Sequence, residues 1–214
     1  MPDYRIKSVH AVQVQSRRHN MAVSARVETM DGAVGKALCY AGVSVGTHEV
    51  HFQYDGGNRW GGLGCMSAVR NVNTIIADTI LGMDVRNQFE IDQAMLSIQG
   101  NGSASVGGNA IAAVSAAVLK AGAAATQMPL YRYIGGENAC MLPVPGAPAF
   151  SGGERWGGAV HTHGNKPTGA FQCFGYDSFS EASSAAWDMY HLFAKELEKR
   201  GVTEGDWFFY RIPA

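Results

Sequence analysis

Apolar and polar residues alternate along the first part of the chain. The alternation covers residues 4–15, 22–29 and 33–40, and a period of two is typical of strands with one buried face. Asp31 and Gly32 separate the second run from the third, and Asp-Gly is a favoured hairpin turn. The pattern predicts three consecutive antiparallel strands.

Two later segments repeat apolar residues at three- and four-residue spacing, which is typical of a helix with one buried face. One segment covers residues 63–83, and the other begins at Asn109. Their apolar positions are Val69, Val72, Ile76 and Ile80, followed by Ile111, Val114 and Val118. Many alanines in the second segment permit close packing against a neighbouring element. Both segments are predicted to be core-facing helices.

Residues 179–200 form the clearest predicted helix of the last third of the chain. Ser178 and Glu181 have the spacing of a capping box, and Gly201 is a typical helix-ending residue. The predicted buried stripe is Ala186, Met189, Phe193 and Leu197, and Lys195, Lys199 and Arg200 suit the negative end of the helix dipole.

The composition is typical of a globular protein and gives no sign of a strongly charged binding partner. The chain has 214 residues, of which 46% are hydrophobic and 16% charged, and its net charge is −1. This balance disfavours nucleic-acid or membrane-surface binding. No apolar run is expected to reach the eighteen or so residues of a membrane helix, and residues 1–5 precede no signal-peptide segment. A cytoplasmic location is therefore expected.

The positions of cysteine and glycine indicate which kinds of site the chain can form. The four cysteines are scattered without a C-x-x-C pair, so they indicate neither a zinc site nor a disulfide framework, and most are expected to be buried free thiols. Glycine is frequent, at 27 residues, and is concentrated in residues 42–64, 100–108 and 152–169, which are candidate functional loops.

A loop of small residues at positions 41–49 is the most distinctive of these glycine-rich stretches. Gly42 and Gly46 let the backbone bend sharply and approach a ligand, and Ser44 offers a hydroxyl between them. A glycine-rich loop by itself is weak evidence, and composition alone favours an ordinary mobile surface loop.

The loop resembles the Ser-Gly-Ala-Ser-Thr-Gly-x-His-Glu loop of the enolase family, the phosphopyruvate hydratases. The similarity continues in register through residues 68–77 and 81–85, the helix from Asn109, and residues 128–136 and 141–145. The resemblance implies an α+β capping domain with a three-stranded antiparallel sheet plus helices in residues 1–136, including a further helix over 88–98.

Residues 137–214 would then be the beginning of an enolase-type α/β (TIM-like) barrel, with the boundary at 135–140. Residues 141–145 match the strand that enters the barrel. The barrel is incomplete in this chain, because so short a stretch cannot supply eight strand–helix units.

The resemblance also implies a substrate site. Gly42, Val43 and Ser44 would close over the substrate, and Ser44 would ligate a second Mg2+ ion. Arg18 lies in a segment similar to the family's Asp-Ser-Arg-Gly-Asn-Pro-Thr, which makes it a candidate for contacting an anion or an interface. An exposed turn arginine explains Arg18 equally well from the sequence alone.

Residues 151–166 resemble an expanded form of the family's Asn-Gly-Gly-x-His-Ala-Gly-Asn-Lys, whose histidine contacts substrate. Either His161 or His163 would take that position. The His-x-His pair also suits metal ligation, although a third ligand is lacking nearby, and two exposed loop histidines remain a plain alternative.

Residues 171–174 align with the family's Leu-Gln-Glu-Phe. Gln172 therefore matches an active-site glutamine, whereas Cys173 replaces a catalytic glutamate. Further on, Trp207, next to Asp206, takes the position of a second glutamate of the family. Cys173 would be a nucleophile if a neighbouring cation lowered its pKa, and a buried inert thiol is the commoner alternative.

Together these features predict an enolase-family lyase that acts with Mg2+ on a phosphorylated or phosphonylated three-carbon acid. The remaining metal ligands and the lysine base would come from a continuation or a second chain, and the family resemblance implies a dimer. The two replaced carboxylates favour altered chemistry, as in phosphonate-pathway relatives, or the alternative of a non-catalytic enolase-like binding or assembly protein.

Overall fold

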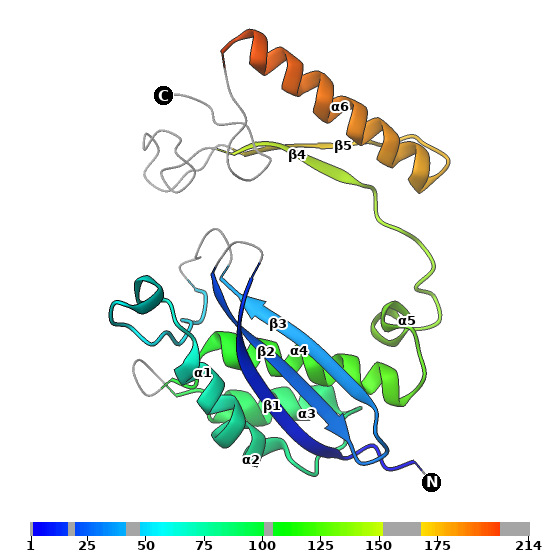
Figure 1. Cartoon of the computed structure of the whole chain (residues 1–214). Coiled ribbons are helices and arrows are strands. Elements are labelled where there is room, and N and C mark those ends of the chain that lie inside the picture. Colours follow the sequence, from blue (N-terminus) through cyan, green and yellow to red (C-terminus); the bar gives the residue numbers. More distant parts are fainter. Residues whose placement is uncertain (1, 17–19, 42–47, 101–104, 152–167, 202–214) are drawn as a thin grey trace. The chain divides into compact units, whose positions relative to one another are not determined.

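The computed structural model divides into two compact units, Met1–Ala139 (unit 1) and Cys140–Ala214 (unit 2) (Figure 1). Each unit is described by itself. The described residues are 2–16, 20–41, 48–100, 105–151 and 168–201.

Unit 1 contains the predicted three-stranded antiparallel sheet. Its strands are β1 (Ile6–Gln15), β2 (Met21–Thr29) and β3 (Val34–Tyr40), in the order β1-β2-β3. Every second residue of β2 from Met21 to Thr29 is buried, because successive side chains of a strand point to opposite faces. The strand prediction is confirmed.

The predicted hairpin at Asp31 and Gly32 is also confirmed. The Thr29 amide donates to the Ala33 carbonyl (2.9 Å), and the Gly32 amide donates to the Thr29 carbonyl (3.0 Å). Gly32 has a φ of +88°, a conformation that glycine adopts without steric cost.

The helices of unit 1 follow the sheet in sequence. They are η1 (Arg59–Gly62), α1 (Met66–Asn71), the π-helix η2 (Val72–Ile76), α2 (Ala77–Ile80), α3 (Gln88–Ser97), α4 (Gly108–Ala125) and α5 (Leu130–Gly135). The predicted helices over 88–98 and from Asn109 are present. The single helix predicted for 63–83 is shorter, running from Met66 to Ile80 with the π-turn inside it.

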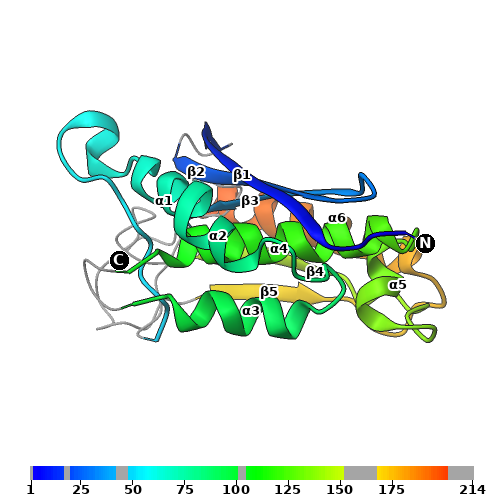
Figure 2. The same cartoon turned by 90° about the horizontal axis from the view of Figure 1, so that it is seen from below.

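Side chains on the π-turn and on α4 join the sheet to the helices. Asn73, within η2, accepts from the Ala11 amide (2.6 Å) and donates to the Ala11 carbonyl (3.0 Å) of β1. The predicted stripe of Val69, Val72, Ile76 and Ile80 is buried, as are Val114 and Val118. The core therefore lies between one face of the sheet and these helices (Figure 2).

Helix α4 corrects one expectation about membranes. It has 18 residues with a mean hydropathy of 1.3, so it is long and apolar enough to span a membrane by length and composition. The expectation that no segment reaches this length was wrong. Half of its residues are buried within the protein, and the helix packs on β2 and β3, which is the behaviour of a core helix.

Unit 2 contains a two-stranded antiparallel sheet and one long helix in its described part. The strands are β4 (Gly146–Ser151) and β5 (Thr168–Gln172), and α6 (Phe179–Lys199) packs against both. The predicted strand at 141–145 is wrong, because the first strand begins at Gly146. Pro143 and Pro145 lack the amide hydrogen that a strand donates, but β4 itself contains Pro148, so the prolines alone do not explain the later start.

The helix prediction for 179–200 is confirmed at both ends. The Glu181 amide donates to Ser178 Oγ (3.2 Å), and the Ser178 amide donates to Glu181 Oε2 (3.1 Å), which forms the expected capping box. The buried stripe is only partly as predicted. Ala186 is buried and Phe193 packs edge-on against Phe171 at 5.3 Å, but Met189 is exposed, because the described part of unit 2 covers only one side of α6.

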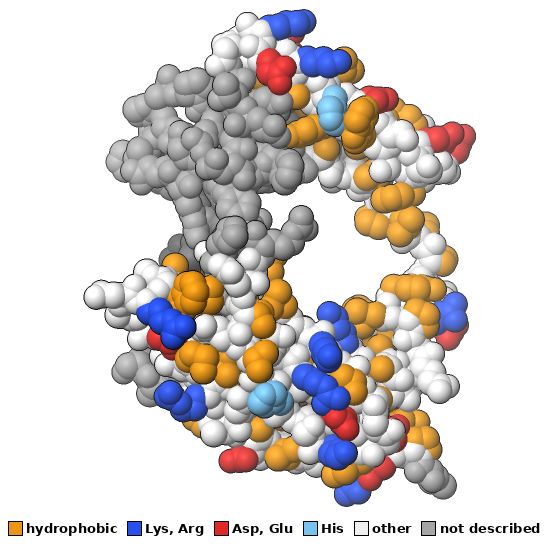
Figure 3. Space-filling model, in the orientation of Figure 1, with side chains coloured by type: hydrophobic (Ala, Val, Ile, Leu, Met, Phe, Trp, Pro, Cys, Tyr) orange, Lys and Arg blue, Asp and Glu red, His pale blue; other side chains and the backbone are white. Residues whose placement is uncertain are grey.

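Charged side chains of both signs are interspersed on the molecular face shown in Figure 3. On the outer side of the unit 1 sheet, Glu28 forms ion pairs with Lys7 (3.3 Å) and Arg26 (2.6 Å). These exposed pairs contribute little to stability, because water and salt screen them.

Candidate functional site

The candidate substrate loop follows β3 directly. Its residues Gly42, Val43 and Ser44 lie outside the described part of the chain, which resumes at His48. The segment 48–55, called here the post-loop segment, forms neither helix nor strand and leads away from the loop. The contacts of this segment determine how one end of the loop is held.

Asn109, at the start of α4, clamps the post-loop segment from within the core. Its Oδ1 accepts from the Gln53 amide (3.0 Å), and its Nδ2 donates to the Gln53 carbonyl (3.1 Å). The Gly108 amide donates to the His51 carbonyl (3.0 Å) beside this clamp. Asn109 is only 1% exposed, so the Asn109 side of both bonds is shielded from water, whereas Gln53 is half-buried.

Gly107 makes room for the Asn109 clamp. Its φ is +101°, and a Cβ atom at this position would lie 2.6 Å from Gln53 Cβ and 2.7 Å from Asn109 Oδ1. A side chain is therefore disfavoured both by the backbone conformation and by the close approach of Gln53. The glycine before α4 serves the attachment of the post-loop segment.

Asp55 fixes the far end of the post-loop segment on helix α1. Its carboxylate accepts from the amides of Met66 (2.9 Å) and Ser67 (2.7 Å), at the start of α1. Burial raises the pKa of Asp55, but the hydrogen bonds from Ser67 and Met66 outweigh this effect and hold the pKa below its ordinary value. Asp55 thus caps a helix that begins eleven residues later in the sequence.

We expect Asp55→Ala to lower the free energy of unfolding by about 1 kcal/mol at neutral pH, since a helix cap is lost. Because the pKa is lower in the folded state, this contribution is present above the unfolded-state pKa and is lost as pH falls through the folded-state pKa. Urea denaturation of both proteins at a series of pH values measures the difference.

The control for this prediction is Asp188→Ala, which removes an exposed carboxylate on α6. Its expected effect is within about 0.5 kcal/mol. A destabilisation by Asp55→Ala that persists unchanged into strong acid would contradict the capping role.

Cys65 lies beside Asn109 and contacts both its side chain and strand β1. Its amide donates to Gln13 Oε1 on β1 (2.6 Å), and its thiol accepts a long contact from Asn109 Nδ2 (3.8 Å). Burial raises the pKa of the Cys65 thiol to about 11, so the thiol is neutral at physiological pH. Cys65 and Cys173 are the buried free thiols, whereas Cys140 is exposed and Cys39 half-buried, so burial holds for two of the four cysteines and not for most of them.

Gln172 and Cys173 are the two predicted site residues that the structure describes. Gln172 ends β5 and is exposed, whereas the preceding Phe171 packs on Phe193 of α6. Side chains alternate along a strand, so Gln172 lies on the face away from α6. This placement leaves the amide of Gln172 accessible to a ligand.

Cys173 lies on the opposite side from Gln172. The residue is 5% exposed, and its Sγ lies 3.4 Å from the Met189 Sδ of α6. The burial fits the packing interpretation that the sequence leaves open, and a catalytic role for Cys173 stays a prediction.

The other predicted site residues lie outside the described residues. These are Arg18, Gly42, Val43, Ser44, His161 and His163, together with Asp206 and Trp207. Within the described ranges, no group of three His, Cys, Asp or Glu side chains could hold a metal ion.

Comparison with known proteins decides the family. Residues 6–134 match the model of the family described as "Enolase, N-terminal domain". The chain belongs to the enolase family. It is 40% identical over 199 residues to an enolase of Campylobacter jejuni, 40% over 202 residues to one of Methanosarcina acetivorans, and 41% over 198 residues to one of Methanopyrus kandleri.

These alignments cover 91–92% of this chain but only 45–47% of each enolase. The chain thus spans about half the length of the curated relatives it matches. The family accounts for the three-stranded sheet with its helices, and for a barrel that is incomplete within 214 residues.

The residues that attach the post-loop segment were not identified from the sequence. Asn109 was assigned only to a helix, and Gly107 only to a glycine-rich turn. A buried asparagine at a helix start after a glycine is a weak local signal for such a clamp. Its partner, Gln53, lies 56 residues earlier, and no periodicity indicates that pairing.

Proposed function

We propose that this chain supplies the substrate loop and the first barrel elements of an enolase-family lyase. Its substrate would be a phosphorylated or phosphonylated three-carbon acid similar to 2-phosphoglycerate or phosphoenolpyruvate. The observation that carries the proposal is the 40% identity to enolases over more than nine-tenths of the chain. A cytoplasmic location is part of the same proposal.

The hydrogen bonds that hold the post-loop segment support this role. A loop that closes over a ligand needs fixed ends, because imprecise positioning weakens binding and catalysis. Asn109 and Asp55 fix the segment that follows the loop. Each of the two side chains contributes two hydrogen bonds, Asn109 to Gln53 and Asp55 to the start of α1. Gly42 and Val43 would then approach the substrate through their backbone, with Ser44 as a Mg2+ ligand.

The remaining candidate contacts have different chemistry. Gln172 would donate or accept a hydrogen bond from its exposed face of β5, and His161 or His163, with Arg18, would contact anionic groups of the substrate. Bound Mg2+ would stabilise the negative charge that develops when a proton is removed beside a carboxylate.

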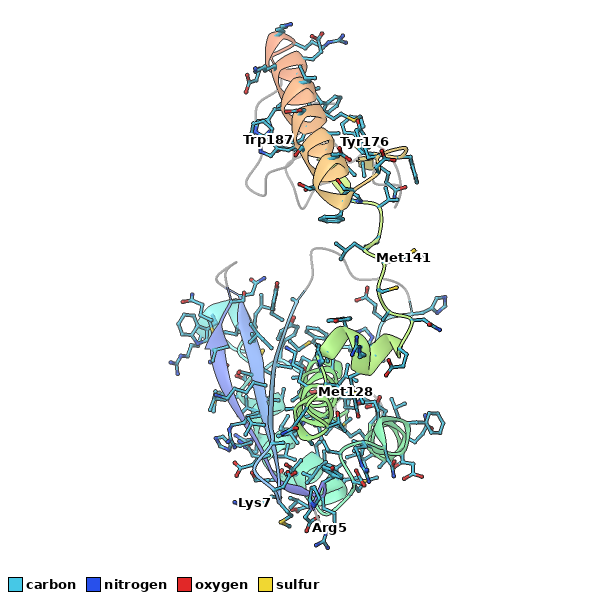
Figure 4. All side chains as sticks on the ribbon, turned by 90° about the vertical axis from the view of Figure 1, so that its right-hand side faces the viewer. Arg5, Lys7, Met128, Met141, Tyr176 and Trp187 are labelled. Atoms are coloured by element: carbon cyan, nitrogen blue, oxygen red, sulfur yellow. The ribbon has the colours of Figure 1, made fainter. Side chains whose placement is uncertain are left out.

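The rest of the metal site and the lysine base are proposed to come from a continuation or from a second chain. Apolar side chains exposed in unit 2 support this, since large exposed apolar groups often mark surfaces that another part of an assembly covers. Met141 is 90% exposed before β4, and Trp187 is 63% exposed on α6 (Figure 4). A dimer, which the family resemblance implies, stays a prediction.

A non-catalytic binding or assembly role is the second candidate. It is favoured by Cys173, a buried thiol at the position of a catalytic glutamate in the family. A thiol that faces Met189 Sδ is unsuited to protonating a leaving hydroxide. A lyase that uses this chain would then require altered chemistry, as in the phosphonate-pathway relatives.

The test is the melting temperature of the protein, purified with any co-purifying chain, with Mg2+ and 2-phosphoglycerate. A ligand at about a hundred times its Kd stabilises the folded state by roughly 2.7 kcal/mol, which raises the melting temperature. We expect Ser44→Ala to weaken the binding at least tenfold, because one proposed Mg2+ ligand is lost.

Ser183→Ala, an exposed serine on α6, is the matched control and should leave the shift unchanged. No shift with the intact assembly would contradict the lyase proposal. A Mg2+-dependent shift without any conversion of the ligand would favour the binding role.

A further inference from the structure

Unit 1 contains an open cavity between the post-loop segment and helices α3 and α4, called here the α3–α4 cavity. Its volume is about 430 Å³, within the range of ligand pockets of roughly 300–1,000 Å³. Its lining residues include Phe52, Asp92, Leu96, Gln99, Ile111 and Ser115. All of them belong to the described part of unit 1.

The walls of the cavity are mainly apolar and come from two facing helix stripes. Asp92 and Leu96 are four residues apart at the α3 end of the cavity, with Gln99 three residues further, so they lie on one side. Ile111 and Ser115 are likewise four residues apart on α4. Apolar surface therefore surrounds a small number of polar groups, as in typical small-molecule sites.

The polar groups at this cavity are rich in acceptors. Asp92 carries a carboxylate, whose oxygens accept from Gln88 Nε2 at 3.0 and 3.1 Å. The same Gln88 nitrogen also donates to Ser115 Oγ (3.0 Å). The amide nitrogen of Gln88 is thus shared between Asp92 and Ser115. Each carboxylate oxygen has two lone pairs and accepts one contact from Gln88, so the Asp92 carboxylate can still accept hydrogen bonds from a ligand.

Gln99 also has a hydrogen-bond acceptor without a described partner. Its Nε2 donates to Ser105 Oγ, whereas its Oε1 is a buried oxygen without a hydrogen-bond partner among the described residues. A buried unpaired acceptor costs about 1–3 kcal/mol relative to a paired one. Among the described residues that line the cavity, none is Lys, Arg or His. A positively charged hydrogen-bond donor on a ligand would therefore complement the Asp92 carboxylate.

We propose that the α3–α4 cavity binds a small amphiphilic amine, with a primary ammonium group on an aryl or short alkyl body. The ammonium group would donate to the Asp92 carboxylate, and the apolar body would lie against Phe52, Leu96 and Ile111. The aromatic ring of Phe52 also suits contact with a cation. This site goes beyond the proposed function and does not rest on it.

The test compares three probes of similar shape on the full chain by isothermal titration calorimetry. Phenethylamine carries the ammonium group, 2-phenylethanol is its neutral counterpart, and 3-phenylpropionate carries a negative charge. We expect saturable binding of phenethylamine, at least tenfold tighter than of either counterpart. Equal binding of the amine and the alcohol would overturn the proposal, since the acceptor cluster would then play no part.

Two variants test the location. Asp92→Asn removes the charge and keeps an oxygen for Gln88, and it should weaken phenethylamine binding at least tenfold. Ala112→Trp fills the cavity from an exposed position of α4 without altering the buried core, and it should abolish binding. Asp78→Asn, an exposed carboxylate on α2 outside the cavity, is the control and should leave the affinity unchanged.

Melting temperatures close to that of the wild type would establish that the variants are folded. Unchanged affinity in folded Asp92→Asn or Ala112→Trp would overturn the assignment of the site. Loss of affinity in both, with the Asp78 control unaffected, would support it.

Discussion

Replacing Gly35 by alanine is expected to lower the free energy of unfolding by about 3 kcal/mol. Gly35 lies on β3 where helix α4 crosses the sheet, and an added Cβ would overlap the Ala117 carbonyl oxygen and the Ala121 amide nitrogen. These are backbone atoms four residues apart, which an α-helix joins by a hydrogen bond. The methyl group can be accommodated only if α4 moves away from the sheet.

Gly146→Ala is the matched control for Gly35→Ala. Gly146 also lies on a strand, but its added Cβ would have ordinary contacts of 3.5 Å with the Phe171 oxygen and 3.6 Å with Gln172 Cγ. Its expected effect is within about 0.5 kcal/mol. Chemical denaturation measures both variants, and similar small effects would show that α4 does not lie against Gly35 as described.

Asn109→Ala is expected to cost about 3 kcal/mol and to loosen the post-loop segment. The substitution leaves the amide and the carbonyl of Gln53 without their partner, and each unsatisfied buried group costs about 1–3 kcal/mol. Hydrogen exchange at the Gln53 amide should accelerate more than exchange in the sheet, because the segment is released locally.

Asn73→Ala provides an unusually close control. Asn73 makes the same pair of bonds, to the amide and the carbonyl of Ala11, but its side chain lies at an exposed position. Ala11 itself is buried, but removal of the exposed Asn73 side chain opens its amide and carbonyl to water, so the expected cost is about 1 kcal/mol. Equal costs for the two variants would contradict the idea that burial makes the Asn109 clamp strong.

The sequence predicted the regular elements because side-chain periodicity reports which face is buried. The alternation in β2 and the stripe from Val69 to Ile80 both matched buried positions. The strand expected at 141–145 rested on the family resemblance, and the first strand of unit 2 begins at Gly146 instead. Periodicity does not report backbone hydrogen bonding, so it does not show the π-turn of η2.

The candidate site was less accessible to sequence reasoning. The loop with Ser44 and the position of Gln172 were recognised by resemblance. The polar clamps were not, because Asn109 meets Gln53 and Asp55 meets α1 only once the chain has folded. Gly35 carried no sequence signal either, since the reason for a glycine there is a helix that begins over seventy residues later.

The most direct test of the central claim is native mass spectrometry of the protein from its natural source, with Mg2+ and 2-phosphoglycerate present. We predict a species heavier than the 22.8 kDa of this sequence that retains the ligand, because further chain must complete the proposed site. A species of 22.8 kDa that retains no ligand would contradict the lyase proposal.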